Sequence, residues 1–259
     1  ALGSWGTVRI RGGELNRAGE AVTVGLIQGN VDQADKWDPA RASVIFRQYL
    51  EMTRRAIGNG AQVVLWPESS TPFFFEEDRP GAEMVRAIAR ESKVPILLGS
   101  DQIDRSTTPP SYFNSAFLLR SDGSTGGVYR KMHLVPFGEY VPLQNLLFFA
   151  SRLVENVSDF SAGDAAVLLP VRGHLVSTAI CYEIVYPNLV RQAASSSELI
   201  TTITNDAWFG RTSAPYQHFA QASMRAIENG RYLVRSANTG ISGIVDPYGR
   251  VLARSSIFE

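Results

Sequence analysis

Short apolar runs alternate with longer stretches of helical periodicity along most of this chain. The runs are rich in β-prone residues and are bounded by Gly, Pro, Asn or Asp, which is typical of buried strands. They predict strands at residues 21–28, 62–66, 94–100, 112–120, 127–131, 175–180, 199–204, 232–237, 242–246 and 250–253. Helical periodicity predicts helices at 39–57, 81–92, 188–194 and 213–229. Strands that alternate with helices, with some strand pairs joined by tight turns, indicate an α/β fold with a mixed sheet.

The first long helix has clear boundary signals. Asp38 is suited to cap its N-terminus, and Pro39 fits the first helical position. The glycines of residues 58–60 are expected to stop it. One face is apolar and is predicted to be buried; it carries Ile45, Tyr49, Met52 and Ala56.

Two segments lack this regularity. Residues 1–20 are rich in Gly and Arg with little periodicity and are predicted to be an arm or linker, which leaves residues 21–259 as one catalytic domain. Residues 137–170 are predicted to be irregular, with a helix at 143–154 and a candidate active-site lid at 137–162. The chain as given contains no apolar stretch of 18 residues, so none of it is expected to span a membrane.

Composition narrows the chemistry further. The 25 Lys and Arg balance the 25 Asp and Glu, which gives no indication of nucleic-acid binding. Three scattered histidines and one cysteine have no metal-ligand spacing, and no glycine-rich phosphate loop is present. We therefore expect no cofactor and no metal. A single cysteine also excludes an internal disulfide.

Three polar side chains stand directly after predicted core strands. Glu68 follows residues 62–66, Lys131 ends residues 127–131, and Cys181 follows residues 175–180. If these strands are neighbours, a carboxylate, an ammonium and a thiol converge. Glu68 could then accept the thiol proton, and Lys131 together with backbone N–H groups after Cys181 could stabilise an oxyanion. Each residue taken alone would more often be a solvated loop residue or, for the cysteine, a small buried hydrophobe.

The sequences of these segments resemble the catalytic motifs of the nitrilase superfamily. The matching motifs are Trp66-Pro67-Glu68, Tyr129-Arg130-Lys131-Met132-His133-Leu134 and Ile180-Cys181-Tyr182-Glu183. This resemblance implies a four-layer α-β-β-α sandwich with a Glu-Lys-Cys triad. Members act on C–N bonds or transfer acyl groups through a thioester.

Longer stretches are similar to one branch, the apolipoprotein N-acyltransferase family. They are Gln28-Gly29-Asn30, residues 36–39, residues 133–143, residues 204–210, Gln217-His218-Phe219, residues 225–228 and residues 235–242. This similarity implies that Cys181 takes an acyl chain from a phospholipid as a thioester. The acceptor would be the N-terminal α-amine of a diacylglyceryl-cysteine lipoprotein precursor, in ping-pong order.

The same resemblance assigns the site residues. It makes Glu68 the general base and Lys131 the oxyanion stabiliser, with Glu139 pairing with Lys131 and orienting it. It places Glu183 just past the nucleophile and puts Trp37 and Tyr182 around the lipid site. Asn205 and Trp208 belong to a segment that follows another strand, where they are candidate supporting residues. Turn formation by Asn205 and Asp206 explains that segment at least as well as direct catalysis.

The family enzyme is an integral membrane protein of the bacterial inner membrane, with its nitrilase domain on the periplasmic side. The chain is therefore expected to be the catalytic domain without the membrane helices, and a naturally soluble relative is the competing interpretation. Aromatic residues at 73–75 and 146–149 would suit a surface that meets lipid, although core packing explains them equally well.

Three other functions remain open at this point. A soluble amidase would use the same triad with water as the acyl acceptor. A non-enzymatic domain could keep the fold, although an intact triad argues against it. A cysteine–histidine hydrolase would need His133 or His218 beside Cys181.

Overall fold

The computed structural model describes residues 2–16, 19–36, 38–136, 138–140 and 160–259. Among these residues, one sheet contains five strands in the order β1-β2-β3-β4-β5. The strands are β1 (Val24–Leu26), β2 (Val63–Leu65), β3 (Ile96–Asp104), β4 (Ser111–Leu119) and β5 (Thr125–Arg130). Strand β4 runs antiparallel to both neighbours, so β1, β2, β3 and β5 all point the same way.

The second sheet contains six strands among the described residues, in the order β11-β10-β9-β8-β7-β6. They are β6 (Leu169–Val171), β7 (His174–Ile180), β8 (Leu199–Thr204), β9 (Tyr232–Ala237), β10 (Gly243–Val245) and β11 (Val251–Arg254). Strands β7, β8 and β9 are parallel, while the remaining pairings are antiparallel.

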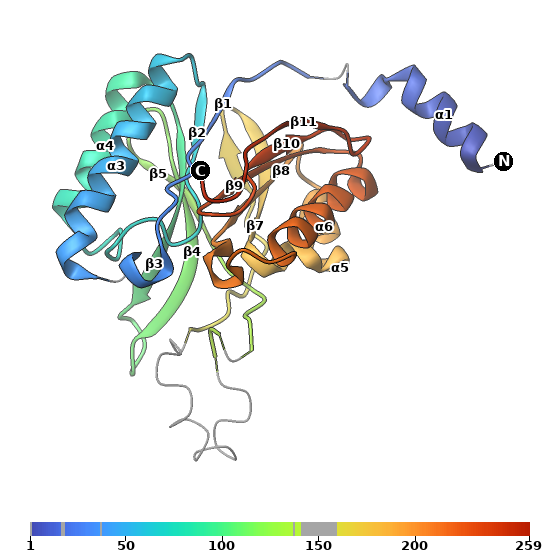
Figure 1. Ribbon diagram of the computed structural model, residues 1–259. Coiled ribbons are helices and arrows are strands. Elements are labelled where there is room, and N and C mark those ends of the chain that lie inside the picture. Colours follow the sequence, from blue (N-terminus) through green and yellow to red (C-terminus); the bar gives the residue numbers. More distant parts are fainter. Residues whose placement is uncertain (1, 17–18, 37, 137, 141–159) are drawn as a thin grey trace, which may run out of the picture.

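The two sheets face one another, and helices cover their outer faces (Figure 1). Helices α3 (Pro39–Gly58) and α4 (Arg79–Ser92) pack on the first sheet, and α5 (Pro187–Ala194) and α6 (Ala214–Asn229) pack on the second. Alternation along each strand makes these layers possible: Val64 faces α3 and α4, whereas Val63 and Leu65 face the other sheet. The predicted four-layer α-β-β-α sandwich is confirmed.

Local signals act as the sequence predicted in α3. The Asp38 carboxylate accepts from the Ala40 N–H at 2.9 Å, and Pro39 is the first helical residue. Of the predicted inner face, Ile45 and Tyr49 are buried, while Met52 and Ala56 are partly buried against the same core. The other three predicted helices and all ten predicted strands are present; β8 and β9 have the predicted bounds, and the others have shifted ends.

Several segments differ from the expectation. Residues Leu2–Gly12 form helix α1, which extends away from the sandwich (Figure 1) and rests on local contacts such as Arg9 over the Trp5 ring. Strand β6 lies at the end of the segment predicted to be irregular, and a short helix, α2 (Gln33–Lys36), was not predicted. The predicted helix at 143–154, the aromatic residues at 146–149, most of the candidate lid and Trp37 lie outside the described residues.

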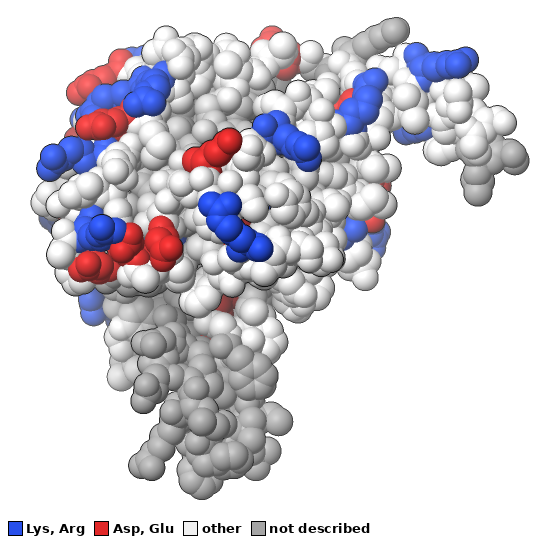
Figure 2. All heavy atoms as spheres, in the orientation of Figure 1, with Lys and Arg blue, Asp and Glu red and all other residues white. Residues whose placement is uncertain are grey.

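In the described part of the chain, none of the helices combines the length and the apolar character needed to cross a membrane. The surface in Figure 2 shows Lys and Arg interspersed with Asp and Glu rather than gathered into one basic patch. This distribution agrees with the balanced composition.

The carboxyl ends of the parallel strands of both sheets meet at one edge of the sandwich. Ser236, in β9, donates to the carbonyls of Ile27 and Leu65 at 2.9 and 3.2 Å, which ties the second sheet to the first. The Asn238 side chain donates to the Val31 carbonyl at 2.7 Å across the same junction. These contacts bring the ends of β1, β2 and β9 together, and ligands in α/β proteins bind beyond such strand ends.

Candidate active site

Glu68 lies after β2 and is held from several directions. Its Oε1 accepts from Asn114 Nδ2 at 2.7 Å and its Oε2 from the backbone N–H of Asn205 at 2.8 Å. Gly99 lets this loop come close, because a Cβ there would lie 2.4 Å from the Pro67 carbonyl oxygen and 2.7 Å from the Glu68 Cα. The carboxylate thus has a fixed position at the junction of the two sheets.

Lys131 follows β5 and is almost completely buried. Its Nζ lies 2.8 Å from Glu139 Oε1 and 3.4 Å from Glu68 Oε1. Burial acts to lower the pKa of Lys131, but the negative charge of Glu68, helped by Glu139, holds the pKa above its usual range. The ammonium therefore stays charged, and the expected contact between Lys131 and Glu139 is present.

Glu139 and Asn114 complete this arrangement. Glu139 Oε1 accepts from Asn114 Nδ2 at 3.0 Å as well as from Lys131, and its Oε2 accepts from the Val135 N–H at 2.9 Å. The Asn114 side chain thereby bridges the two carboxylates. The backbone carbonyl of Asn114 accepts from the Lys131 backbone N–H at 2.8 Å. We call Glu68, Lys131 and Glu139 the thiol-side cluster.

Cys181 occupies the turn between β7 and a 3₁₀ turn at Cys181–Val185. Its φ of 52° lies in the left-handed region, which costs a non-glycine residue about 1–3 kcal/mol and persists only where surrounding contacts impose it. The turn directs the chain sharply away from the strand. A side chain at such a bend is presented at the sheet edge, as the sequence predicted.

The electrostatic surroundings keep the thiol protonated at rest. Burial raises the pKa of Cys181 to about 12, and the Glu68 carboxylate adds to this rise while Lys131 opposes it. Burial also acts to raise the pKa of Glu68, but Lys131, Lys36 and the hydrogen bonds from Asn114 and Asn205 together lower it. An ionised carboxylate thus lies near a neutral thiol, which suits proton transfer during attack rather than a preformed thiolate.

Glu183 connects the segments that carry the nucleophile and the lysine. It is fully buried and accepts from the backbone N–H groups of Ile180, Met132 and His133 at 2.7, 2.7 and 3.0 Å. The Tyr129 hydroxyl donates to it at 2.9 Å. Burial raises the pKa of the Glu183 carboxyl, and the backbone donors act against the rise. Its position is therefore a supporting one.

The remaining predicted residues are placed differently from one another. Asn205 is buried, and its side chain contacts Gln33 and Asn238 at 2.8 and 2.9 Å while its N–H holds Glu68. The predicted turn role and the supporting role thus coincide in Asn205. Tyr182 is partly exposed beside Tyr186, and Trp208 is 69% exposed. Trp37 lies outside the described residues.

His218 lies behind the nucleophile rather than beside its thiol. Its Nε2 is 3.2 Å from the backbone carbonyl oxygen of Cys181, and its Nδ1 is 2.9 Å from Asp206 Oδ1. Arg235 Nη2 donates to Asp206 Oδ2 at 2.8 Å, and all three side chains are buried. His133 is exposed and its ring lies against Tyr186. Neither arrangement supports the cysteine–histidine hydrolase.

Sequence reasoning missed three residues of this site. Asn114 and Arg235 each place a polar side chain inside a predicted apolar strand, which is a readable signal of a buried hydrogen-bond network. Lys36 is buried and donates from Nζ to the Glu68 carbonyl at 3.3 Å. Burial lowers the pKa of Lys36, while the charges of Glu68, Asp101 and Cys181 act to raise it. Lys36 belongs to residues 36–39, which are similar to the family, but the sequence alone indicates no role for it.

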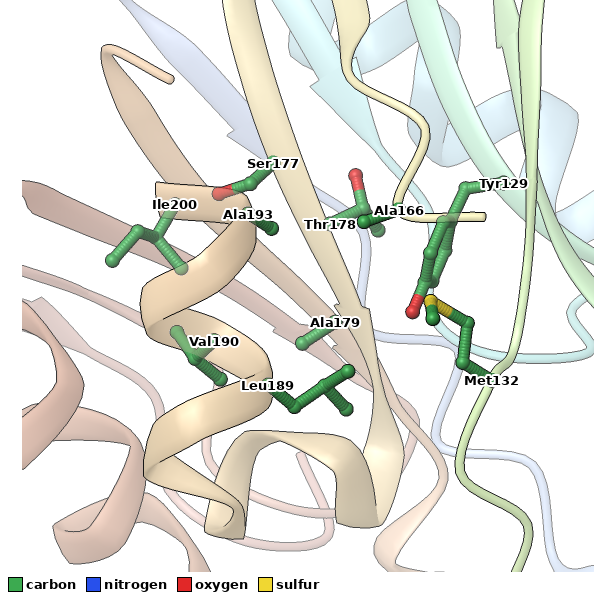
Figure 3. Close-up of a pocket in the computed structure, with 10 residues that line it drawn as sticks. All are labelled: Tyr129, Met132, Ala166, Ser177, Thr178, Ala179, Leu189, Val190, Ala193 and Ile200. Atoms are coloured by element: carbon green, nitrogen blue, oxygen red, sulfur yellow. The ribbon is translucent and has the colours of Figure 1, made fainter. Parts of the chain in front are cut away.

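Over the described ranges, no group of three or more His, Cys, Asp or Glu side chains is arranged to hold a metal ion. Figure 3 shows a small hollow between β5, β7 and α5, lined mainly by apolar or small residues, among them Tyr129, Met132, Ala179 and Leu189. Its lining, as far as the structure describes it, contains none of Glu68, Lys131 and Cys181.

Comparison with solved structures defines the class of fold. Nit3 of Saccharomyces cerevisiae, a member of the nitrilase superfamily, aligns with a TM-score of 0.69 at 17% identity over 91% of this chain and 86% of that one. A mutant of the amidase from Nesterenkonia sp. AN1, with acrylamide added to its active-site cysteine, aligns with a TM-score of 0.67 at 21% identity over 92% and 90%. The fold is that of the nitrilase superfamily.

The sequence comparisons identify the family. Residues 23–259 match the model of the carbon-nitrogen hydrolase family, and the chain belongs to that family. The apolipoprotein N-acyltransferase of Geobacter metallireducens is 41% identical over 243 residues, which are 93% of this chain and 47% of that protein. That of Pseudomonas aeruginosa is 36% identical over 247 residues, again 93% and 47%. The chain thus spans about half the length of the curated relatives it matches.

Proposed function

We propose that this domain transfers a fatty acyl chain from a phospholipid to the N-terminal α-amine of a diacylglyceryl-cysteine lipoprotein precursor. The observation that carries the proposal is the buried thiol-side cluster at Cys181 in a chain that resembles apolipoprotein N-acyltransferases over 93% of its length. The partners are then a phospholipid donor and a lipoprotein acceptor. The place of action is the periplasmic side of the bacterial inner membrane.

In the first half-reaction, Glu68 takes the thiol proton as Cys181 Sγ attacks the ester carbonyl carbon of the phospholipid. The carbonyl oxygen becomes an oxyanion beside Lys131 Nζ and the Tyr182 N–H. Collapse breaks the ester C–O bond, and protonated Glu68 returns its proton to the departing alkoxide. The products are a lysophospholipid and a Cys181 thioester.

In the second half-reaction, the acceptor amine attacks the thioester carbonyl. Glu68, ionised again, removes a proton from the amine nitrogen, and the same donors stabilise the oxyanion. Collapse breaks the C–S bond, and the thiolate regains a proton from Glu68. The raised pKa of Cys181 favours this return of the proton to sulfur, which restores the resting thiol.

Intact-mass spectrometry tests this chemistry directly. The chain and Cys181→Ala are each incubated with dipalmitoyl phosphatidylethanolamine in detergent micelles. We expect a gain of one acyl chain on the parent protein, removed by hydroxylamine and absent from the variant. Addition of a diacylglyceryl-cysteine peptide should discharge the thioester and yield an N-acylated peptide. An acyl gain that persists in Cys181→Ala would contradict the proposal.

A second candidate is an amidase that passes the acyl group to water. The observation in its favour is that the same carboxylates and ammonium lie together near Cys181, and an amidase would use them with water as the acyl acceptor. Turnover of acetamide, without any adduct from phospholipid, would support the amidase and overturn the acyltransferase.

A further inference from the structure

Three side chains from different elements meet behind the nucleophile, and we call Asp206, His218 and Arg235 the carbonyl-side cluster. Asp206 follows β8, His218 belongs to α6 and Arg235 belongs to β9. At their relative accessibilities of 0%, 4% and 0% they are removed from water. Buried charges are costly, so a cluster of this kind needs well-formed mutual contacts.

The cluster is tightly built. Arg235 Nη2 lies 2.8 Å from Asp206 Oδ2 and 3.1 Å from His218 Nδ1, and Thr204 Oγ1 donates to Asp206 Oδ1 at 2.9 Å. Gly240 permits this packing, because a Cβ there would lie 2.1 Å from Asp206 Oδ2. The position of the imidazole is therefore fixed by neighbours on three sides, with Phe209 and Tyr182 rings nearby.

The other ring nitrogen of His218, Nε2, contacts the backbone of Cys181. A carbonyl oxygen can only accept, so the 3.2 Å contact between His218 Nε2 and the Cys181 oxygen requires a proton on Nε2. The Asp206 carboxylate can only accept as well, so the imidazolium satisfies both contacts, whereas the neutral Nε2–H tautomer satisfies only the one to Cys181. His218 is therefore a hydrogen-bond donor to the peptide group that joins Cys181 to Tyr182.

That peptide group has two consequences for the reaction. The peptide is planar, so fixing the direction of its carbonyl also fixes the direction of the Tyr182 N–H on the opposite side. A donor on the carbonyl also polarises the peptide and strengthens its N–H as a donor. Cys181 is held at a φ of 52°, a conformation that relaxes unless contacts such as this one maintain it.

We propose that His218 is a positioning residue, which holds the Cys181–Tyr182 peptide so that the thiol and the Tyr182 N–H face the same reacting carbonyl. Asp206 and Arg235 act through His218 by fixing its ring. This proposal rests on the proposed function only in taking Cys181 as the nucleophile.

A pair of substitutions separates this role from a structural one. Gln places its amide nitrogen where His has Nε2, so His218→Gln keeps a donor to the Cys181 carbonyl. Asn places its amide nitrogen near the position of Nδ1, so His218→Asn keeps the contact with Asp206 and loses the donor to Cys181. His174→Gln, at an exposed histidine paired with Glu198, is the matched control.

Two readouts are measured on the full chain, together with thermal unfolding of every variant. One is the rate at which acrylamide adds to Cys181, and the other is single-turnover acylation by dipalmitoyl phosphatidylethanolamine in micelles. We expect His218→Asn to lose about tenfold or more in both rates through misalignment, with little change in KM. His218→Gln should remain within about threefold of the parent protein, because one neutral hydrogen bond is retained. His174→Gln should match the parent protein.

Equal rates for the Gln and Asn variants, at any level, would overturn the proposal, since a merely structural role does not distinguish the two nitrogens. The two hypotheses fail separately. If acrylamide adds faster to Cys181 in His218→Gln than in His218→Asn, but phospholipid does not acylate the parent protein, the positioning role is supported and the proposed function is not. If the parent protein is acylated but His218→Gln and His218→Asn have equal rates, the proposed function is supported and the positioning role is not.

Discussion

Two buried charge clusters flank the nucleophile, and they act on different atoms of it. The thiol-side cluster brings two carboxylates and an ammonium to the side chain, where Glu68 helps to raise the pKa of Cys181 and Lys131 lowers it. The carbonyl-side cluster pairs Asp206 with Arg235 and reaches the Cys181 backbone through His218. One cluster sets the protonation of the reacting atom, and the other sets its direction.

Loss of charge should therefore have unequal consequences on the two sides. Lys131→Met leaves the buried Glu68 and the partly buried Glu139 without the Lys131 charge, and breaking a buried pair in this way costs about 3–5 kcal/mol of unfolding free energy. It also removes the proposed oxyanion donor, so we expect the acylation rate to fall by about 10²–10³-fold. Urea unfolding and single-turnover acylation measure the two losses.

Asp206→Asn is the comparison variant on the carbonyl side. It leaves Arg235 buried without its carboxylate, so we expect a stability loss of the same order, about 3–5 kcal/mol. Its acylation rate should fall only about tenfold, because the effect passes through backbone alignment. Equal losses of rate for Lys131→Met and Asp206→Asn would remove the distinction between the clusters.

Close backbone packing offers a second, smaller perturbation. Gly99→Ala would push on the Glu68 loop and Gly240→Ala on Asp206, and overpacking of this kind costs about 1–3 kcal/mol. We expect Gly99→Ala to lower the acylation rate more, because it displaces Glu68, the proposed general base. Gly58→Ala is the control: a Cβ there meets nothing within 4 Å, so it should be neutral or stabilising by about 0.5–1 kcal/mol. Thermal unfolding and acylation rates decide the order.

The thiol-side cluster was largely readable from the sequence, and the carbonyl-side cluster was not. Glu68 and Lys131 stand at the ends of apolar runs, so strand prediction places each at a strand end and brings them together if the strands are neighbours. His218 lies inside a helix and Arg235 inside a strand. Their roles depend on contacts with Asp206, which lies 12 positions before His218 and 29 positions before Arg235. Local patterns carry no information on such pairings.

The fold shows the same division. Strand β8 has the predicted bounds because its apolar run is buried on both faces, whereas β6 has only three residues and depends on pairing with β7. Helix α1 contains Gly3 and Gly6 and leaves Trp5 and Val8 exposed, so no amphipathic pattern predicts it. Segments whose structure follows from burial were predicted, and segments that follow from a partner strand or from local hydrogen bonds were not.

Acid should weaken the carbonyl-side cluster by about 1 kcal/mol. Burial acts to raise the pKa of Asp206, but Arg235 and the hydrogen bond from His218 lower it to about 2, from 3.8. A carboxyl whose pKa is lower in the folded state contributes stability at pH values above its unfolded-state pKa. This contribution is lost as the pH falls toward the folded-state pKa. Between pH 7 and pH 3 this contribution falls by about 1 kcal/mol. The stability gap between the parent protein and Asp206→Asn should narrow by that amount in urea unfolding, and a constant gap would contradict the assigned pairing.

Trp208 lies outside both clusters and should give the smallest effect on stability. Its side chain is 69% exposed, so Trp208→Ala should change the unfolding free energy by about 0.5 kcal/mol or less. If Trp208 contacts the acyl donor, KM for micellar phospholipid should rise severalfold while the rate of acrylamide addition to Cys181 stays unchanged. Tyr216→Ala, at another exposed aromatic residue, is the matched control. Equal KM values for both variants and the parent protein would exclude Trp208 from substrate binding.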